Sequence, residues 1–182
     1  TQFALVQGNQ IGTAANASDP LPNGGDGILI ADGAQDHFIG GIGIMVTNSI
    51  AFNRGAGVRV RGASTLRNTI RQNIIARNDG PGIALEEGGN GGLAAPTVRR
   101  IDAFRAEGST FPGAVVDIYS DAEDEAERLE VTVRADGNGY FYAERAFMGP
   151  NYTAIATDAE GNSSPIGGEG VVAPTATPGA GE

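Results

Sequence analysis

The sequence predicts an all-β protein in which a short solenoid of about three parallel coils is followed by a small antiparallel β-sandwich. Three observations carry this prediction. The stretch NSIAFNRGAGVRV (48–60) recurs twenty-five residues later as NIIARNDGPGIAL (73–85). Glycine makes up 29 of the 182 residues, which favours many turns over long helices. From Pro96 onward, longer runs alternate apolar and polar residues, as strands of an antiparallel sheet do.

Each coil of the predicted solenoid contains up to three short strands. The clearest run places glycine before two aliphatic residues that are separated by one position, and two shorter runs flank it. These runs lie at 9–11, 27–30, 38–39, 48–50, 57–60, 69–70, 73–75 and 82–85. Period two over short runs bounded by glycine is typical of strands. Three strands in a repeat of about 25 residues predict coils that stack with parallel strands about 4.8 Å apart.

Asparagine recurs at the expected corners of the coils. Stacking in register places the same residue type above itself, so inward aliphatic side chains form a continuous core and corner asparagines can form amide ladders. One predicted ladder comprises Asn9, Asn48 and Asn73, and another comprises Asn53 and Asn78. In the favoured interpretation, these side-chain amides bond to backbone groups at the turns and stack on one another as ladders. Ligand binding is the alternative.

Four segments share the pattern N-x-I-G, a loop, G-[IV]-x-I and N-x-I. They are GNQIG (8–12), PNGGDGILIADGAQDHFIGG (22–41), NSIAFNRGAGVRVRGAS (48–64) and NTIRQNIIARNDGPGIAL (68–85). With this pattern the chain resembles the right-handed parallel β-helix repeats of the pectate-lyase-like superfamily, in the form found in large secreted bacterial proteins. The resemblance implies a parallel β-helix segment over residues 1–95 and an extracellular or cell-surface location. Lyases, hydrolases, adhesins and inert spacers share this architecture, so the resemblance implies no single function.

Two stretches exceed the regular repeat and are expected to protrude as loops, TAANASDPLPNG (13–24) and GGIGIMVT (40–47). Loops that protrude from a rigid scaffold often carry binding sites, and a tolerated insertion is the favoured alternative. Arginines recur on the predicted outer faces, and they form either the solvated face of a sheet or a groove for an anionic sugar. They are Arg59, Arg67, Arg71 and Arg77. Arg61 and Glu86 are expected to form an ion pair between neighbouring coils.

The sequence contains no recognisable catalytic constellation, and we predict no catalytic residue. Hydrolases of this architecture need paired carboxylates on one face, whereas Asp26, Asp32 and Asp36 stand at strand ends and turns. The single histidine, His37, is interpreted as a corner or surface residue, with a general base as the alternative. A fragment of a polysaccharide lyase or hydrolase is therefore the least favoured function.

Residues 96–166 are predicted to form the β-sandwich. Alternating runs lie at 96–104, 113–121, 127–136, 139–147 and 151–164, separated by turn clusters. The stretches PGAVVDIYSD, RADGNGYFYAE and YTAIATDAEGNSSP resemble the immunoglobulin-like or prealbumin-like domains that follow β-helices in secreted bacterial proteins. Residues 167–182 are rich in glycine, proline and threonine, and we expect them to form an extended linker or tail.

Charge and composition argue against several partners. The formal charge is −10, and residues 96–182 hold six arginines against fifteen carboxylates, while residues 1–95 hold six against seven. A strongly acidic surface repels nucleic acid and anionic membranes. No stretch approaches the ~20 apolar residues of a membrane span. We therefore expect no nucleic-acid partner and no direct membrane insertion. The absence of cysteine excludes disulfides and thiolate metal sites.

No cofactor is expected, with calcium as the alternative left open. The candidate ligands are carboxylates in acidic loops and turns, namely Asp121, Glu123, Asp124, Asp136 and Asp158. Their spacing does not match the 12-residue loop of an EF-hand. A solvated acidic loop is the default interpretation, and Asp-Gly-Asn-Gly is also an ordinary hairpin turn.

These observations favour a non-catalytic structural or adhesive module. The solenoid begins at Thr1 without a visible cap, so its first coil should expose unpaired strand edges and an apolar cross-section. Head-to-tail self-association into a fibre or lattice, or further coils, would cover that end. The alternative is a carbohydrate-binding module that uses residues 13–24 and the arginine face to hold a cell-surface polysaccharide. Its weakness is that tryptophan is absent and that Phe38, Phe52 and the tyrosines of the second half are expected mostly at core positions.

Overall fold

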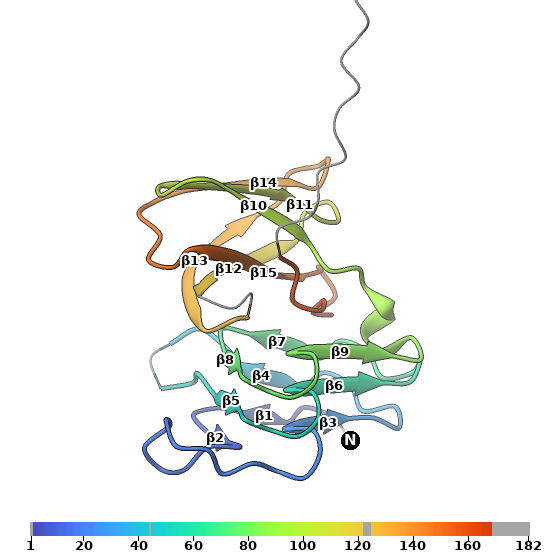
Figure 1. Ribbon diagram of the computed structural model, residues 1–182. Helices are drawn as coiled ribbons and strands as arrows, with labels where there is room; N and C mark the ends of the chain where they lie inside the picture. Colours follow the sequence, from blue (N-terminus) through green and yellow to red (C-terminus); the bar gives the residue numbers. More distant parts are fainter. Residues whose placement is uncertain (1, 44, 122–124, 169–182) are drawn as a thin grey trace, which may run out of the picture.

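A computed structural model describes residues 2–43, 45–121 and 125–168. The described part is all-β, with three parallel and two antiparallel sheets of three strands each (Figure 1). The elements are β1 (Leu5–Val6), β2 (Gln10–Ile11), β3 (Ile28–Ile30), β4 (Phe38–Gly40), β5 (Ser49–Ala51), β6 (Val58–Arg61), β7 (Thr69–Arg71), β8 (Ile74–Ala76), β9 (Ile83–Glu86), the 3-10 helix η1 (Gly89–Gly92), β10 (Thr97–Asp102), β11 (Arg105–Ser109), β12 (Val115–Asp121), β13 (Arg128–Arg134), β14 (Tyr140–Glu144) and β15 (Asn151–Thr157).

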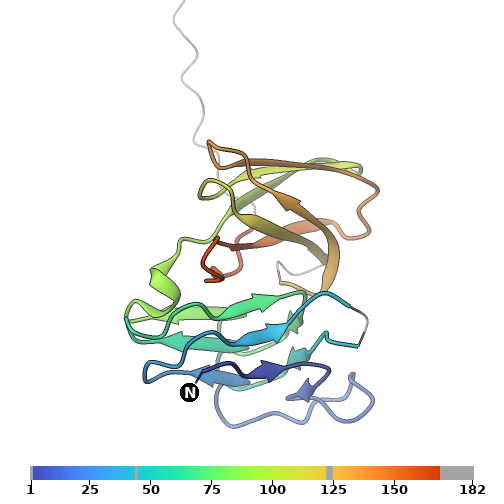
Figure 2. The ribbon, with the colours of Figure 1, turned by 180° about the vertical axis from the view of Figure 1, so that it is seen from behind.

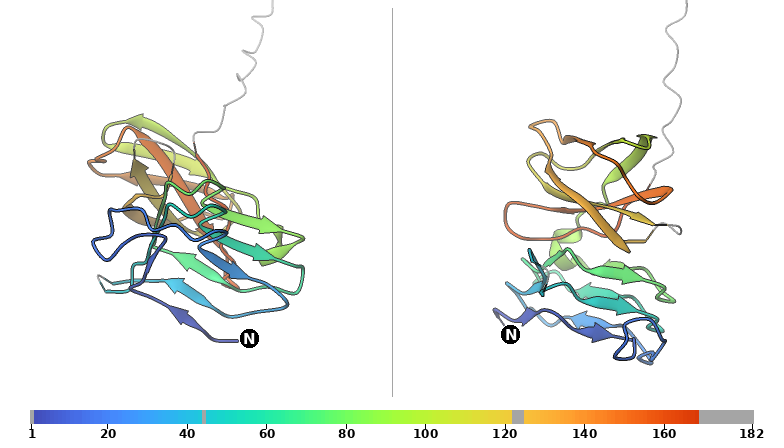
Figure 3. Two further views of the ribbon diagram at one scale, coloured as in Figure 1. Left: turned by 60° about the horizontal axis from the view of Figure 1, so that its bottom comes forward. Right: turned by 90° about the vertical axis from the view of Figure 1, so that its left-hand side faces the viewer.

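The first nine strands form a stack of three coils. The parallel sheets are β1-β4-β7, β2-β5-β8 and β3-β6-β9, so each consecutive trio of strands makes one coil and adds one strand to every sheet. Figure 3 shows the coils lying one above another. Pairing is in register, because Ile11 faces Ile50 and Ile50 faces Ile75. This arrangement is compatible with a β-helix. The sequence pattern does not predict β1, which completes the first coil.

The core of the coil stack consists of aliphatic side chains that repeat at one strand position. Val6, Ile39 and Ile70 form one such column. Val6, in the first coil, is only partly buried, whereas Ile39 and Ile70 are fully buried in the same apolar cluster. Each added coil thus removes the apolar surface of its neighbour from water, which is the main source of stability in a stacked repeat.

The second half of the chain consists of two antiparallel sheets that pack face to face, β10-β11-β14 and β13-β12-β15. This packing is consistent with the predicted β-sandwich. The expectation that only a turn cluster separates the runs at 96–104 and 113–121 is wrong, because strand β11 lies between them and pairs with β14. Gly108 permits this pairing, since a Cβ atom there would lie 2.4 Å from the Phe141 ring.

Strands β12 and β15 of the sheet β13-β12-β15 are buried on both faces, because they lie between the other sheet and the coil stack (Figures 1 and 2). In β12, Val116 and Ile118 belong to the core between the sheets, whereas Tyr119 belongs to the core of the coil stack. Alternating apolar and polar residues usually mark a half-exposed strand. In β15, however, every residue from Tyr152 to Thr157 is buried, because its polar face meets the coils.

Candidate functional sites

The predicted asparagines lie in two columns along the coil axis. Asn9 Nδ2 donates to Asn48 Oδ1 at 3.1 Å, and Asn48 Nδ2 donates to Asn73 Oδ1 at 2.9 Å. In the other column, Asn53 Nδ2 donates to Asn78 Oδ1 at 2.9 Å. These amides also bond to backbone groups of neighbouring strands. The columns therefore join the coils and supply partners for backbone groups at the corners.

A third corner column contains two asparagines and the histidine. Asn90 Oδ1 accepts the Asn68 N–H at 3.1 Å, and Asn68 Oδ1 accepts the His37 N–H at 3.3 Å. His37 Nδ1 in turn accepts the Ala4 N–H at 2.9 Å, so the imidazole takes the place of an asparagine amide. The Asn68-Thr69-Ile70 triplet, which repeats the N-x-I pattern, is the sequence signal for this column.

His37 is a buried corner residue rather than a surface residue. Burial lowers the pKa of its imidazole, because a charged ring loses hydration inside the stack. The lowered pKa favours the neutral ring, whose unprotonated Nδ1 can accept the Ala4 N–H. The side chain therefore supports the corner of the first coil, and its accepting nitrogen is already occupied.

The four arginines proposed for an anionic-sugar groove, Arg59, Arg67, Arg71 and Arg77, are each held in ion pairs. Arg59 Nε donates to Asp26 at 2.7 Å, and Arg67 Nε donates to Asp36 at 2.6 Å. Hydrogen bonds from these two guanidinium groups are the main reason that the pKa values of Asp26 and Asp36 are lowered. The remaining pairs of this set are Arg59–Glu86, Arg71–Asp117 and Arg77–Glu127. A groove for an anionic sugar needs uncompensated positive charge, which these pairs do not provide.

The expected pair between Arg61 and Glu86 is only partly correct. Arg61 lies opposite Glu86 in the strand register, but Arg59 forms the ion pair with Glu86. The inserted loop at 13–24 is closed on itself, because Asn16 Nδ2 donates to Asp19 at 2.7 Å. This local turn accounts for the polar side chains of Asn16 and Asp19.

Asp136 and Asp158 are the two calcium candidates whose side chains the structure describes. Glu123, Asp124 and the side chain of Asp121 lie outside the described part. Asp136 and Asp158 each accept two backbone N–H groups within their own turns, at 2.8 to 2.9 Å. No group of three or more acidic, histidine or cysteine side chains that could hold a metal ion occurs among residues 2–43, 45–121 and 125–168.

The third coil is covered by the second half of the chain. Tyr119, Ile155 and Ile166 share one apolar cluster with Ile70 and Ile75 of that coil. Backbone groups are paired across the same contact, because Ile75 N–H donates to the Ala126 carbonyl at 3.0 Å and Ala126 N–H donates back at 3.1 Å. The second half therefore supplies at this end the apolar cover and the hydrogen bonds that a fourth coil would supply.

A buried ion pair crosses the same contact. Arg71 donates through Nε and Nη2 to the two carboxylate oxygens of Asp117, both at 2.7 Å, and Thr132 Oγ1 donates to Asp117 at 2.6 Å. The Asp117 side chain is 0% exposed and that of Arg71 is 15% exposed. The hydrogen bonds to Asp117 raise the pKa of the Arg71 guanidinium. This pair fixes the orientation of β12 on the coil stack.

The first coil has no such cover among the described residues. Strands β1, β2 and β3 stand at the edges of their sheets (Figure 3). A cavity of about 320 Å³, lined mainly by apolar side chains such as Val6, Ile28 and Ile30, opens at this coil. Phe3, Leu5 and Leu29 are 75%, 69% and 54% exposed. Unpaired edges beside exposed apolar surface are the features of an association surface.

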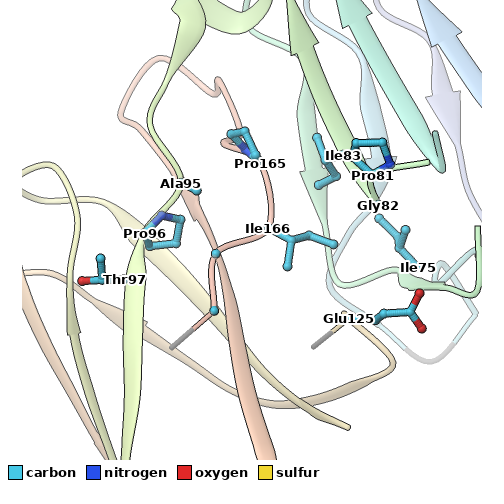
Figure 4. A pocket seen from close by; sticks show the side chains of 12 residues that line it. Ile75, Pro81, Gly82, Ile83, Ala95, Pro96, Thr97, Glu125, Pro165 and Ile166 are labelled. Carbon is cyan, nitrogen blue, oxygen red and sulfur yellow. The ribbon is translucent and has the colours of Figure 1, made fainter. Parts of the chain in front are cut away.

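A second hollow, of about 630 Å³, lies where the third coil meets the second half. Figure 4 shows Ile75, Ile83 and Ile166 on its wall, with Glu125 at one side. The wall is mostly aliphatic and proline. Glu125 and Gly168 directly adjoin, in sequence, segments outside the described residues. This hollow belongs to the contact between the coil stack and the second half.

Comparison with known proteins yields no relative, since no protein-family model and no curated protein matches the chain. No helix in the described residues has the length and apolar character needed to cross a bilayer.

Proposed function

We propose that the protein is a non-catalytic structural or adhesive module of a bacterial cell surface. In this proposal the coil stack is a right-handed parallel β-helix segment, and the second half is an immunoglobulin-like sandwich that terminates it. The repeat pattern of residues 3–92 and its resemblance to secreted β-helix proteins support the handedness and the location. The observation that carries the proposal is the asymmetry of the stack, because the second half covers its third coil, whereas no described residue covers its first coil.

The open coil is proposed to bind a second copy of the chain. Edge strands present unpaired backbone groups that pair readily with other strands, and burying exposed apolar surface adds about 25 cal/mol per Å². A head-to-tail fibre built from stacked coils would also require a free third coil, which Tyr119, Ile155 and Ile166 cover. Two first coils can instead meet head to head, and this symmetric contact closes at a dimer.

Light scattering over a concentration series tests this proposal. The mass should rise from that of one 18.5 kDa chain to twice that value and then remain constant. A mass that stays at one chain at every concentration would contradict self-association, and growth beyond two chains would contradict the closed dimer.

Paired variants locate the contact. Leu5→Glu combined with Leu29→Glu places two charges on exposed positions of the first coil, so the variant should remain a monomer where the wild type is a dimer. Leu129→Glu is the matched control, because Leu129 is also exposed but lies in β13 of the second half. Dimerisation that survives the double substitution, or that is lost in the control, would place the contact elsewhere.

A further inference from the structure

The sheet β10-β11-β14 has one face that no described residue covers. Its inner face packs against the second sheet through Val98, Ala106 and Phe141. Its outer face points away from the coil stack (Figure 1). The second sheet differs, because the outer faces of its strands β12 and β15 meet the coils. The face of β10-β11-β14 is therefore the exposed sheet surface of the second half.

Two tyrosines stand side by side on this outer face. Tyr140 and Tyr142 alternate with the buried Phe141 and Ala143 in β14, and they are 45% and 41% exposed. Residues two apart in a strand project from one face about 7 Å apart. The expectation that the tyrosines of the second half mostly occupy core positions is thus wrong for this pair, although it holds for Tyr119 and Tyr152.

Tyr140 belongs to a polar network on this face. Tyr140 Oη donates to Glu107 Oε2 at 2.9 Å, and Arg99 Nε donates to Glu107 Oε1 at 2.7 Å. The hydrogen bond from Arg99, followed by that from Tyr140, lowers the pKa of the Glu107 carboxyl. In the strand register, Glu107 stands between Arg99 and Tyr142. The network holds the Tyr140 ring in place before any ligand arrives, which reduces the entropy cost of binding.

Two arginines of this sheet are paired with carboxylates. Arg99 pairs with Glu107, and Arg105 Nε donates to Asp102 at 2.8 Å. An anionic ligand would find no uncompensated cation in these pairs and would be repelled by the net charge of −10. A peptide strand would need a free sheet edge rather than a sheet face. The surface offers aromatic rings beside polar groups that can donate and accept hydrogen bonds.

We propose that the outer face of β10-β11-β14 is a binding surface for a neutral glycan, with Tyr140 and Tyr142 stacking on the apolar faces of successive sugar rings. Arg99, Glu107 and the Tyr142 hydroxyl lie where they can bond to sugar hydroxyls. A neutral, hydroxyl-rich chain with apolar ring faces matches both the paired arginines and the aromatic pair. This site is separate from the arginine face and the 13–24 loop, and it does not depend on association through the first coil.

Calorimetric titration with hexasaccharides tests the proposal on the full chain. The probes are β-1,4-linked glucose, β-1,4-linked mannose and α-1,4-linked glucose as neutral glycans, and polygalacturonate as the anionic comparison. We expect saturable binding of at least one neutral probe. Because the chain contains four tyrosines and no tryptophan, a change in tyrosine fluorescence on binding provides a second readout.

Substitutions on the face separate stacking from hydrogen bonding. Tyr142→Ala should weaken binding of the neutral probe roughly tenfold or more, as for an aromatic residue at the centre of an interface, while Tyr142→Phe should keep most of it. Met148→Ala is the control, because Met148 is exposed in the same half but outside this sheet. The double variant Leu5→Glu and Leu29→Glu should bind normally.

Three results would overturn the proposal. The first is that no neutral hexasaccharide at millimolar concentration produces heat or a fluorescence change. The second is that polygalacturonate binds more tightly than every neutral probe. The third is that Tyr142→Ala leaves the binding of the neutral probe unchanged. Circular dichroism of each variant ensures that a loss of binding is not a loss of fold. A wild-type chain that stays monomeric but still binds glycan would contradict the association proposal and leave the glycan proposal intact.

Discussion

The buried ion pair between Arg71 and Asp117 should hold the second half on the coil stack, and its removal provides a sharp test. Asp117→Ala leaves the Arg71 guanidinium, only 15% exposed, without the carboxylate that accepts its two 2.7 Å hydrogen bonds. It also removes the acceptor of Thr132 Oγ1. The free energy of unfolding should therefore fall substantially.

Two physical arguments give a similar size for the decrease in the free energy of unfolding caused by Asp117→Ala. Removing one partner of a buried ion pair usually costs about 3–5 kcal/mol. Two unit charges about 4 Å apart attract each other by about 4 kcal/mol at an effective dielectric constant near 20. We therefore expect Asp117→Ala to lower the free energy of unfolding by about 4 kcal/mol. Arg71→Met combined with Asp117→Ala should recover much of this loss, because no charge is then left buried.

Equilibrium unfolding in urea measures these changes, and a double-mutant cycle isolates the coupling between the two residues. Asp79→Ala is the matched control, because the Arg54–Asp79 pair is more than half exposed on both sides and should contribute at most about 1 kcal/mol. A loss below about 1 kcal/mol for Asp117→Ala, or a double variant that is less stable than both single variants, would refute this reasoning.

Two further predictions concern the corner columns. Asn48→Ala removes the acceptor of the Asn9 N–H and the donor to the Val6 carbonyl, so it should cost about 2–6 kcal/mol for two unsatisfied groups at about 1–3 kcal/mol each. Urea unfolding measures this loss of stability. Asn138→Ala, at an exposed turn, is the control and should change the free energy of unfolding by no more than about 0.5 kcal/mol. Equal effects of the two substitutions would contradict a structural role for the ladder. Burial lowers the folded-state pKa of His37 below its ordinary 6.5, so the unfolded chain binds the proton more readily. The contribution of His37 to stability should therefore be present above about pH 6.5 and be lost as the pH falls through the folded pKa. His37→Asn keeps a hydrogen-bond acceptor but does not titrate, so it should remove this part of the pH dependence of stability between about pH 8 and pH 5. Identical curves of unfolding free energy against pH for the wild type and the variant would contradict this role of His37.

Much of the coil stack could be predicted from the sequence. Glycine followed by aliphatic residues at period two marks strands such as β6 and β9, and the 25-residue recurrence sets Val58 opposite Ile83. Asn48 and Asn73, also 25 residues apart, are joined by their side chains. These features are predictable because each is a local pattern that repeats, and parallel stacking converts an equal sequence interval into direct contact.

The exposure of particular side chains could not be predicted in the same way. The Tyr140-Phe141-Tyr142 triplet places an aromatic residue on both faces of β14, so the alternation does not reveal which face is inside. Likewise, Asp117 looks like a surface carboxylate between Val116 and Ile118, yet it is 0% exposed. Periodicity separates the two faces of a strand, but it does not say what covers each face.

The sequence by itself determined most strands of the coil stack, the corner asparagines and the three-coil repeat, because these depend on residues close together or at a constant interval. Only the tertiary structure decided that the second half terminates the third coil, that the arginines are paired with carboxylates and that two tyrosines remain exposed. Those outcomes depend on which surfaces meet after the strands have formed. Such contacts join residues as far apart as Arg71 and Asp117, 46 positions along the chain, and no local pattern encodes them.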